Sequence, residues 1–398
     1  MSVMVYEMLQ DAPAQQAVIK VIGVGGGGCN AVNNMIDAGM KGVEFVAANT
    51  DADSLAQNRA PTRIQLGQTL TKGLGAGSKP EVGRNSALED RERIGDVLKG
   101  CDMVFIAAGM GGGTGTGAAP VVAEVARELG VLTVAVVTRP FVFEGGKRLA
   151  VSVQGVDDLK KNVDSLIVIP NQKLMEVLGD DVTMREAFRA ADDVLKGAVA
   201  GVAEVITTPG FVNVDFADVR TVMSLNGMAM MGTASASGID RARVAAEQAV
   251  ASPLLDDVTL IGAKGLLVNI STAPGCLRMR EYSEIMEIIT QLADGDADMK
   301  FGTAEVEGMP DDEIRVTLIA TGLSPNSKKN AARDERPDYL KVVRTGTDDM
   351  PFEVPAAEND VSGFLKSGRR AVTTGADFAN PAVMDNYDIP AFLRKQAD

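Results

Sequence analysis

Two segments of the chain combine an apolar run of strand length, a cluster of glycines and the start of a helix-like pattern. They read VIKVIGVGGGGCNAV at residues 18–32 and MVFIAAGMGGGTGTGAAP at residues 103–120. A strand that turns through glycine into a helix is typical of α/β proteins, in which helices cover both faces of a mostly parallel sheet. Ligands of such sheets bind beyond the carboxyl ends of the strands, so we expect a binding site at these two turns.

The same alternation continues through the first half of the chain and predicts a Rossmann-like, mostly parallel sheet. Each apolar run is followed by a stretch with helical or turn character. The predicted strands are residues 18–24, 43–48, 103–108, 131–138 and 165–169.

A long helix is predicted for residues 183–207, where apolar residues recur at three- and four-residue spacing until Pro209 and Gly210 stop the pattern. Its apolar face is broad, so we expect the helix to pack between two domains. A second, smaller α/β region follows, with strands predicted at 227–235, 265–271 and 314–321 and helices at 241–250 and 283–292.

The character of the chain changes after residue 323. Residues 324–385 are polar, charged and broken by prolines, which predicts a mostly disordered linker. In the last residues Ile389, Phe392 and Leu393 can share one helical face, which indicates a docking peptide; a frayed tail with chance apolar residues is the alternative. The predicted parts are a flexible arm at 1–17, a first domain at 18–182, the central helix at 183–209, a second domain at 210–323, the linker at 324–385 and the peptide at 386–398.

The absence of histidine excludes several kinds of chemistry. Without an imidazole the chain cannot use Ser-His-Asp or Cys-His catalysis or form an HExxH zinc site. A formal charge of −15 disfavours nucleic acid and anionic membrane as direct partners. Three widely spaced cysteines fit neither a CxxC metal site nor a disulfide framework, and no secretory signal opens the chain, so we expect a reducing cytosol.

The glycine turns favour a phosphate ligand. Glycine lets backbone N–H groups approach phosphate oxygens, and a helix N-terminus adds partial positive charge. We expect Asn30 to open the first helix and Pro120 to lie in the first turn of a second helix over 118–130. Thr114 and Thr116 hydroxyls are expected as further donors, so that two turns at one sheet edge would hold a polyphosphate from two sides.

Two alternatives remain open at this point. Gly23, Gly25 and Gly28 satisfy GxGxxG, which is also the pattern of a dinucleotide-binding oxidoreductase, although such an enzyme needs only one glycine turn. Close packing of a helix on a strand also selects glycines. The chain has no GxxxxGK[ST] motif, which excludes an ordinary Walker-type NTPase.

The segment GGGTGTG at residues 111–117 is similar to the signature of the tubulin/FtsZ family. Other segments resemble the bacterial FtsZ branch of that family, and the resemblance covers roughly residues 18–323 and the last dozen. These segments are GVGGGGCNAV (23–32), NTDADSL (49–55), TKGLGAG (71–77), PFVFEGGKR (140–148), NVDFADVRTVM (213–223) and DIPAFLRKQ (388–396).

The resemblance implies that the glycine turns hold the phosphates of GTP or GDP. Glu144 and Arg148 match positions that contact the ribose and phosphate region, and Asn171 and Asp193 match positions that read guanine. A carboxylate can accept from both N1–H and the exocyclic amine of guanine, whereas adenine has no N1–H, so Asp193 would favour GTP over ATP. The positions implied at the phosphates are Gly26, Gly27, Gly28, Cys29, Asn30, Gly113, Thr114 and Gly115.

The resemblance also implies a shared catalytic site. The nucleotide pocket of the next subunit would receive Asn213, Asp215 and Asp218, and the two acids would orient the attacking water. Mg²⁺, held mainly by the phosphates, would screen the charge of the phosphates. From local sequence alone, Asp215 could simply cap a helix, and no neighbouring residue in the sequence neutralises the acids. A head-to-tail contact of this kind generates an open filament.

The expected function is therefore that of a GTPase subunit whose filaments build the bacterial division ring, in the cytoplasm at mid-cell. The terminal peptide would dock membrane-tethering and regulatory division proteins, because the chain has no expected membrane anchor. A filament with another task, on plasmids or cell shape, is the alternative that DIPAFLRKQ argues against. Cys29 and Asp192 depart from the family pattern, in which many relatives have Gly or another small polar residue at the first position and Asn is usual at the second. Asp192 would either weaken nucleotide binding slightly or simply face solvent. The docking positions are Asp388, Ile389, Pro390, Phe392, Leu393 and Arg394.

Overall fold

The computed structural model describes residues 17–179, 181–208, 210–225, 227–255, 263–292 and 297–323. The predicted linker and docking peptide, with Asp388, Ile389, Pro390, Phe392, Leu393 and Arg394, lie outside the described residues, as does most of the predicted N-terminal arm.

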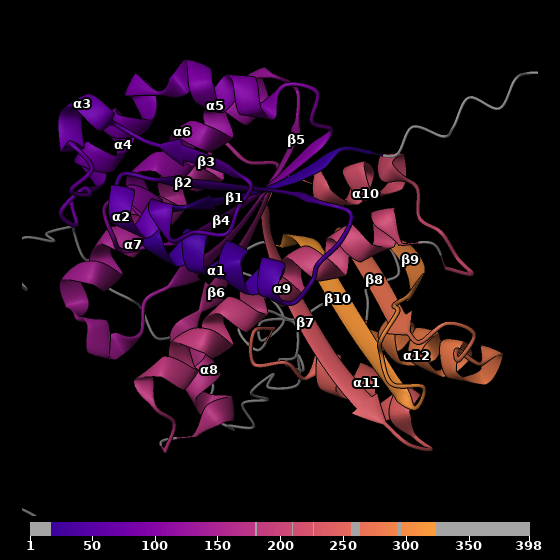
Figure 1. Ribbon diagram of the computed structural model, residues 1–398. Helices are drawn as coiled ribbons and strands as arrows, with labels where there is room; N and C mark the ends of the chain where they lie inside the picture. Colours follow the sequence, from indigo (N-terminus) through magenta and orange to yellow (C-terminus); the bar gives the residue numbers. More distant parts are fainter. Residues whose placement is uncertain are drawn as a thin grey trace, which may run out of the picture. The chain divides into compact units, whose positions relative to one another are not determined.

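The described strands form one ten-stranded sheet in the order β3-β2-β1-β4-β5-β6-β7-β10-β8-β9 (Figure 1). All pairs from β3 to β6 are parallel, in the doubly wound order 3-2-1-4-5-6, which confirms the predicted Rossmann-like sheet. These six strands are β1 (Ile19–Val24), β2 (Glu44–Asn49), β3 (Thr62–Gln65), β4 (Met103–Gly109), β5 (Leu132–Arg139) and β6 (Ser165–Pro170).

The second α/β region continues the same sheet. Strand β7 begins beside β6 through a short parallel pairing that runs from Ser165 and Gly227 to Ile167 and Ala229. Strand β10 is antiparallel to both β7 and β8, and β9 is parallel to β8. Their bounds are β7 (Gly227–Ser237), β8 (Gly265–Thr272), β9 (Asp298–Glu305) and β10 (Glu313–Leu323).

The sequence patterns missed two strands, β3 and β9, and both form an edge of the sheet. Their sequences, TRIQ and DMKFGTAE, contain no continuous apolar run. An edge strand is covered on fewer sides than a central one, so its residues need not be apolar, and the pattern that marks buried strands is absent.

Helices cover both faces of the first six strands, with α5 and α6 on one face and α1 and α9 on the other (Figure 1). None of the described helices is long and apolar enough to cross a membrane. The helices are α1 (Gly25–Asp37), α2 (Ala52–Ala56), α3 (Gln68–Thr71), α4 (Pro80–Glu89), α5 (Arg91–Leu98), α6 (Thr114–Glu128), α7 (Gly146–Lys160), α8 (Asn171–Leu178), α9 (Met184–Thr207), α10 (Phe216–Met223), α11 (Arg241–Val250) and α12 (Met279–Leu292), with a short 3₁₀ turn, η1, at Val142–Glu144.

Strand β4 shows how the sheet builds two cores at once. Side chains of a strand alternate between its faces. Phe105 and Ala107 therefore join the core under α1 and α9, while Val104 and Ile106 join the core under α5 and α6. A third core lies between α11, α12 and the strands of the second region.

The central helix α9 confirms the prediction for residues 183–207. Thr183 caps it by accepting a hydrogen bond from the Glu186 N–H, in a capping box. On its buried face Leu195 and Val202 belong to the same core as Leu267 of β8, so the helix packs against strands of both regions.

Two helices begin earlier than the sequence indicated. Helix α1 begins at Gly25, not at Asn30, so most glycines of the first glycine-rich segment already belong to the start of the helix. Helix α6 begins at Thr114, and Pro120 lies inside it instead of in its first turn. Glycine has a low helix propensity, so the sequence pattern did not show where either helix begins. In the folded chain the close packing of each helix on its strand outweighs that low propensity.

Candidate functional site

The two glycine turns meet at the carboxyl edge of the sheet. Strands β1 and β4 are neighbours, with Val24 opposite Ala108 at their carboxyl ends. Gly25 has a φ of +72°, and a Cβ there would lie 2.6 Å from the backbone N of Gly115. The turns therefore touch, as the sequence analysis expected of two loops around one ligand.

Several of the expected phosphate-binding glycines are required by packing. A Cβ on Gly28 would lie 2.2 Å from the Ala107 carbonyl oxygen, and one on Gly115 would lie 2.6 Å from that of Gly109. A Cβ on Gly113 would lie 2.9 Å from the Ala76 Cβ. Close packing thus accounts for these three glycines whatever ligand binds.

Gly26 and Gly112 differ from the others. A Cβ at either position would meet no atom of the protein within 4 Å. Gly27 is intermediate, since a Cβ there would lie 3.3 Å from Gly109. Backbone around Gly26 and Gly112 therefore borders open space at the edge where a ligand of this fold binds. Gly112 was not among the expected positions, although it lies within GGGTGTG.

The threonines of the second turn hold its shape. The hydroxyl oxygen of Thr116 accepts a hydrogen bond of 2.9 Å from the Gly111 N–H. The hydroxyls of Thr114 and Thr50 are 2.6 Å apart and share a hydrogen bond. Each hydroxyl thus has a partner in the protein, but Thr116 only accepts in its bond, so its O–H can still donate. The role of both hydroxyls as further donors to the ligand stays a prediction.

Glu144 and Arg148 form a pair beside the second turn. The Glu144 carboxylate accepts from the Phe141 N–H at 2.9 Å and from an Arg148 Nη at 2.6 Å. The backbone of Arg148 lies close enough to Gly111 that a Cβ on that glycine would be 2.8 Å from the Arg148 carbonyl oxygen. The guanidinium is half exposed, so it remains accessible to an anionic ligand.

Asp193 is held against α1. Its Oδ1 accepts from Asn34 Nδ2 at 3.1 Å and from Lys196 Nζ at 2.8 Å. Burial acts to raise the pKa of Asp193, but the hydrogen bonds from Lys196 and Asn34 and the positive charges of Lys196 and Arg189 together outweigh it, so the pKa lies below its usual range. Asn30 lies one helical turn before Asn34, on the same side of α1, which places it between the glycine turn and Asp193.

Asn171 begins α8 directly after β6. The residue is 4% exposed, and its side-chain Oδ1 has no hydrogen-bond partner among the described residues. A buried amide oxygen without a partner is costly, which is consistent with a ligand as the missing partner.

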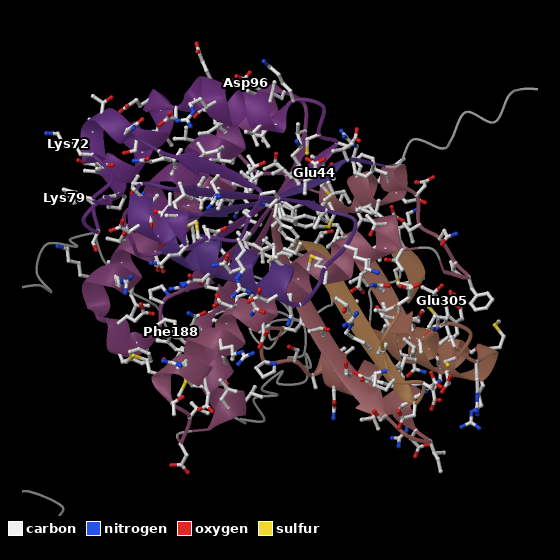
Figure 2. All side chains as sticks on the ribbon, viewed as in Figure 1. Glu44, Lys72, Lys79, Asp96, Phe188 and Glu305 are labelled. Carbon is white, nitrogen blue, oxygen red and sulfur yellow. The ribbon has the colours of Figure 1, made fainter. Side chains whose placement is uncertain are left out.

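An aromatic cluster beside this edge was missed by the sequence analysis. Phe141 and Phe143 stack with ring centroids 4.9 Å apart, and Phe188 of α9 packs edge-on against both. Phe188, labelled in Figure 2, is 40% exposed, and Phe143 is 54% exposed. A base can stack on exposed aromatic rings such as these. The sequence carried no signal for the cluster, because Phe188 is distant in sequence from Phe141 and Phe143.

The two residues that depart from the family pattern are both withdrawn from water. Burial raises the pKa of the Cys29 thiol to about 12, so the thiol stays protonated. Burial also raises the pKa of Asp192 to about 7, and the adjacent negative charge of Asp193 adds to the shift. The idea that Asp192 simply faces solvent is therefore wrong.

The expected catalytic residues lie together in the second region. Asp215 is the N-cap of α10 and accepts from the Asp218 N–H at 2.7 Å, so the capping role is real. Asn213 Oδ1 accepts from the Gly210 N–H at 2.9 Å. Lys300 Nζ of β9 lies 3.0 Å from Asp218 Oδ1, so a cation distant in sequence neutralises this acid.

These acids lie near the amino ends of the central strands, whereas the glycine turns follow the carboxyl ends. Arg220, on the same helix as Asp218, reaches to 3.5 Å from the carbonyl oxygen of Asp102, which precedes the first residue of β4. The glycine turn follows the last residue of β4, Gly109. Seven strand residues span about 20 Å, so one chain does not bring its acids to its own glycine turns.

No group of three or more Cys, Asp or Glu side chains in the described part of the chain is placed to hold a metal ion. A cavity of about 680 Å³ lies elsewhere, between the end of α1, helix α9 and strands β9 and β10. It contains none of the residues expected to bind GTP or to act in catalysis, although Lys196, which donates to Asp193, also lines it.

Comparison with known proteins decides the family. The model described as Tubulin/FtsZ family, GTPase domain, matches residues 18–179, and the model described as FtsZ family, C-terminal domain, matches residues 227–324. The cell division protein FtsZ of Neisseria meningitidis serogroup A is 57% identical over 396 residues, which cover 98% of each chain. The chain belongs to the FtsZ family.

Other FtsZ proteins agree with this assignment. FtsZ of Pseudomonas aeruginosa is 52% identical and covers 98% of this chain and 99% of the relative. The solved structure of an empty FtsZ dimer from M. jannaschii is 42% identical and superposes with a TM-score of 0.74, covering 77% of this chain and 88% of that chain. As an FtsZ family member the chain is a tubulin-like GTPase whose subunits polymerise in cell division, and the oxidoreductase alternative is excluded.

Proposed function

We propose that each subunit holds GTP at the carboxyl edge of its sheet and that the acids of the next subunit's α10 loop complete the hydrolytic site. The observation that carries the proposal is the separation of the two halves of the site. The glycine turns follow β1 and β4, whereas Asp218 lies on a helix that contacts the start of β4. A head-to-tail neighbour would bring the second half to the first.

The phosphates are assigned to the open backbone of the two turns. Gly26 and Gly112 leave room that a Cβ would occupy, and the N-termini of α1 and α6 add their partial positive charge. Arg148 supplies a full charge beside the second turn. Gly27, Gly28, Cys29, Asn30, Gly113, Thr114 and Gly115 complete the turns as the sequence analysis expected, several of them by shaping the backbone and not by touching the ligand.

The base is assigned to the side chains that α8, α9 and η1 present beside the glycine turns. Asn171 offers its unpartnered Oδ1, and the exposed face of Phe188 offers a stacking surface. Both described hydrogen bonds to the Asp193 carboxylate go to Oδ1, so Oδ2 is available to accept from N1–H and the exocyclic amine of guanine. Adenine offers no N1–H, which is the basis of the proposed preference for GTP.

At the hydrolysis step Asp218 would orient the attacking water and accept its hydrogen bond, while Asp215 keeps α10 in place through its cap and Asn213 shapes the preceding loop. Positioned help of this kind is worth about 10² to 10⁴ in rate. Mg²⁺ bound through phosphate oxygens would supply charge neutralisation at the β- and γ-phosphates.

Exposed apolar side chains at both edges support the head-to-tail contact. Leu74, 86% exposed, lies in the loop whose Ala76 packs against Gly113 at the nucleotide edge. Phe211, 74% exposed, lies in the loop that leads to Asp215 at the other edge. Each apolar side chain is unfavourable in water, and a filament contact would bury both.

A mixing experiment tests the shared site. Asp218→Ala leaves the nucleotide half intact, and Gly26→Val leaves the acid half intact. Each variant alone should show little phosphate release from GTP, whereas a mixture should recover part of the wild-type rate at interfaces that combine the two intact halves. Wild-type turnover should also stay near zero below a threshold concentration and rise with light scattering above it. A mixture with no recovery despite co-assembly would mean that each subunit is a complete enzyme.

The partners and the site in the cell are proposed on the family alone. Self-association belongs to the family, and we propose docking of membrane-tethering and regulatory division proteins through Asp388 to Arg394, at the mid-cell division site in the cytoplasm. Deletion of residues 388–398 should leave GTP turnover unchanged and abolish recruitment of the filaments by such a tether. A fall in turnover would instead make the peptide part of the catalytic fold.

A further inference from the structure

Lys300 lies on β9, the edge strand of the second region, between two carboxylates. Its Nζ is 3.0 Å from Asp218 Oδ1 and 3.5 Å from Asp298 Oδ1. The side chain of Lys300 is 30% exposed and that of Asp218 is 42% exposed, so the pair is neither buried nor fully solvated.

Strand β9 holds the loop before α10 at a second point. The Thr303 N–H donates to the Val212 carbonyl oxygen at 2.9 Å, and the Val212 N–H donates to Thr303 Oγ1 at 2.9 Å. Lys300 lies on the same strand, opposite Leu267 of the buried strand β8. One strand, fixed by the sheet, therefore holds both the loop at Val212 and the carboxylate of Asp218.

A stabilising role does not explain the pair well. An ion pair with this exposure contributes little to stability, because water screens the attraction and two long side chains lose freedom. A positional role explains it better. A cation on a fixed strand selects one orientation of the Asp218 carboxylate, which no other side-chain ion pair or hydrogen bond within the described residues holds on the partly exposed first turn of α10.

The charge of the lysine has a second consequence. In the filament proposed above, Asp218 approaches the polyphosphate of the next subunit, and both groups are anionic. The hydrogen bond to Asp218 comes first among the causes that raise the pKa of Lys300, followed by the charges of Asp298 and Asp218, so the lysine stays protonated. A fixed positive charge beside the acid offsets part of the repulsion at the contact.

We propose that Lys300 is a positioning residue for GTP hydrolysis, which holds the Asp218 carboxylate toward the attacking water and offsets its charge against the phosphates. The inference rests on the proposed function, in which Asp218 acts on the next subunit's GTP. Because Lys300 belongs to the second region, the orientation of the acid depends on where β9 lies relative to α10.

The test compares three variants of the full chain. Lys300→Met keeps roughly the length of the side chain and removes its charge, whereas Lys300→Arg keeps a positive charge at this position. Asp298→Asn is the matched control, because it removes the charge of the second carboxylate near Lys300. Lys300→Met should lower the GTP turnover of assembled protein by about 10- to 100-fold, as expected for a misplaced catalytic group. GTP affinity and filament formation should persist, Lys300→Arg should recover most of the rate, and Asp298→Asn should stay within about twofold of the wild type.

A double-variant cycle separates positioning from a general structural effect. If Lys300 acts through Asp218, adding Lys300→Met to Asp218→Asn should produce no further loss of turnover. Wild-type turnover in filaments of Lys300→Met would overturn the inference, as would additive losses in the double variant. Loss of filaments in Lys300→Met that Lys300→Arg restores would make Lys300 an assembly residue and would overturn it too. Undiminished turnover of Asp218→Ala would instead remove the proposed function itself.

Discussion

The carboxylate of Asp215 accepts a hydrogen bond of 2.7 Å from the backbone N–H of Asp218. Asp215 thus caps helix α10, and Asp218, the other candidate catalytic acid, belongs to the first turn of that helix. The two acids are separated by three positions in one short segment, yet their roles differ, because Asp215 is occupied by the cap and Asp218 projects beside Lys300.

The first prediction separates these roles. Asp215→Ala should lower the free energy of unfolding by about 1 kcal/mol, because the cap is lost, and should lower turnover as well. Asp215→Asn should keep the stability, since asparagine also caps helices. Asp218→Ala should lower turnover about 10²-fold or more with little change in stability. Urea unfolding and phosphate release on the same samples check this. Equal stability of Asp215→Ala and wild type would contradict the capping role.

The second prediction concerns two glycines of the first turn. Gly28→Ala should cost roughly 1 to 3 kcal/mol or more in stability, because its Cβ would lie 2.2 Å from a backbone oxygen. Gly26→Ala should leave stability equal or slightly higher, because the new Cβ meets no atom and alanine favours the helix. Only Gly26→Ala should be a folded protein with weakened GTP binding. Unfolding curves and nucleotide titration distinguish the two, and a matched stability loss in both would contradict the assignment.

The third prediction is a pH dependence at Asp192. Burial raises the pKa of Asp192 to about 7, whereas an unfolded aspartate has a pKa near 3.9. Between these values the folded state binds the extra proton, so the free energy of unfolding falls as pH rises from about 4 to about 7 and then levels off. Asp192→Asn removes this dependence and should be more stable than wild type by about 1 to 3 kcal/mol at pH 8.

The advantage of Asp192→Asn should shrink as the pH is lowered toward 5. Urea unfolding at four pH values on nucleotide-free protein measures it, with Asp157→Asn on the exposed side of α7 as the control for loss of a surface charge. A difference between Asp192→Asn and wild type that stays constant with pH would rule out the buried carboxylate as its cause.

The fourth prediction concerns the three free cysteines. Burial raises the pKa of Cys29 to about 12 and that of Cys101 to about 11, whereas Cys276 is partly exposed. Because the thiolate is the reactive form, iodoacetamide at pH 8 should label Cys276 in the native protein and all three thiols after unfolding. Mass spectrometry locates the labels. Native labelling of Cys29 that GTP prevents would show instead that this thiol faces the nucleotide.

Elements with a strong local signal were predictable. The strands β1, β2, β4, β5 and β6 lie in the interior of the sheet and carry continuous apolar runs, and α9 has both a capping residue and a broad apolar face. The edge strands β3 and β9 lack such runs. The starts of α1 and α6 were predicted too late in the sequence, because glycine is a poor helix former when its packing against neighbouring strands is not known.

The site divides in the same way. Its glycine turns and the α10 acids could be proposed from motifs that are contiguous in sequence. Asp193 could be proposed only through the family resemblance, because a single acid on a helix is otherwise interpreted as a solvated residue. The aromatic cluster of Phe141, Phe143 and Phe188 could have been suspected only after α9 was placed beside η1.

By itself, the sequence determined the α/β class, the two phosphate-type turns, the central helix and the family resemblance, since all of these are written in short-range patterns. Only the tertiary structure decided which glycines border open space, that Lys300 neutralises Asp218, and that the acids lie across the sheet from the turns. The physical reason is that these relationships join residues far apart in the chain. They depend on how strands are ordered and paired, which no local pattern of side chains specifies.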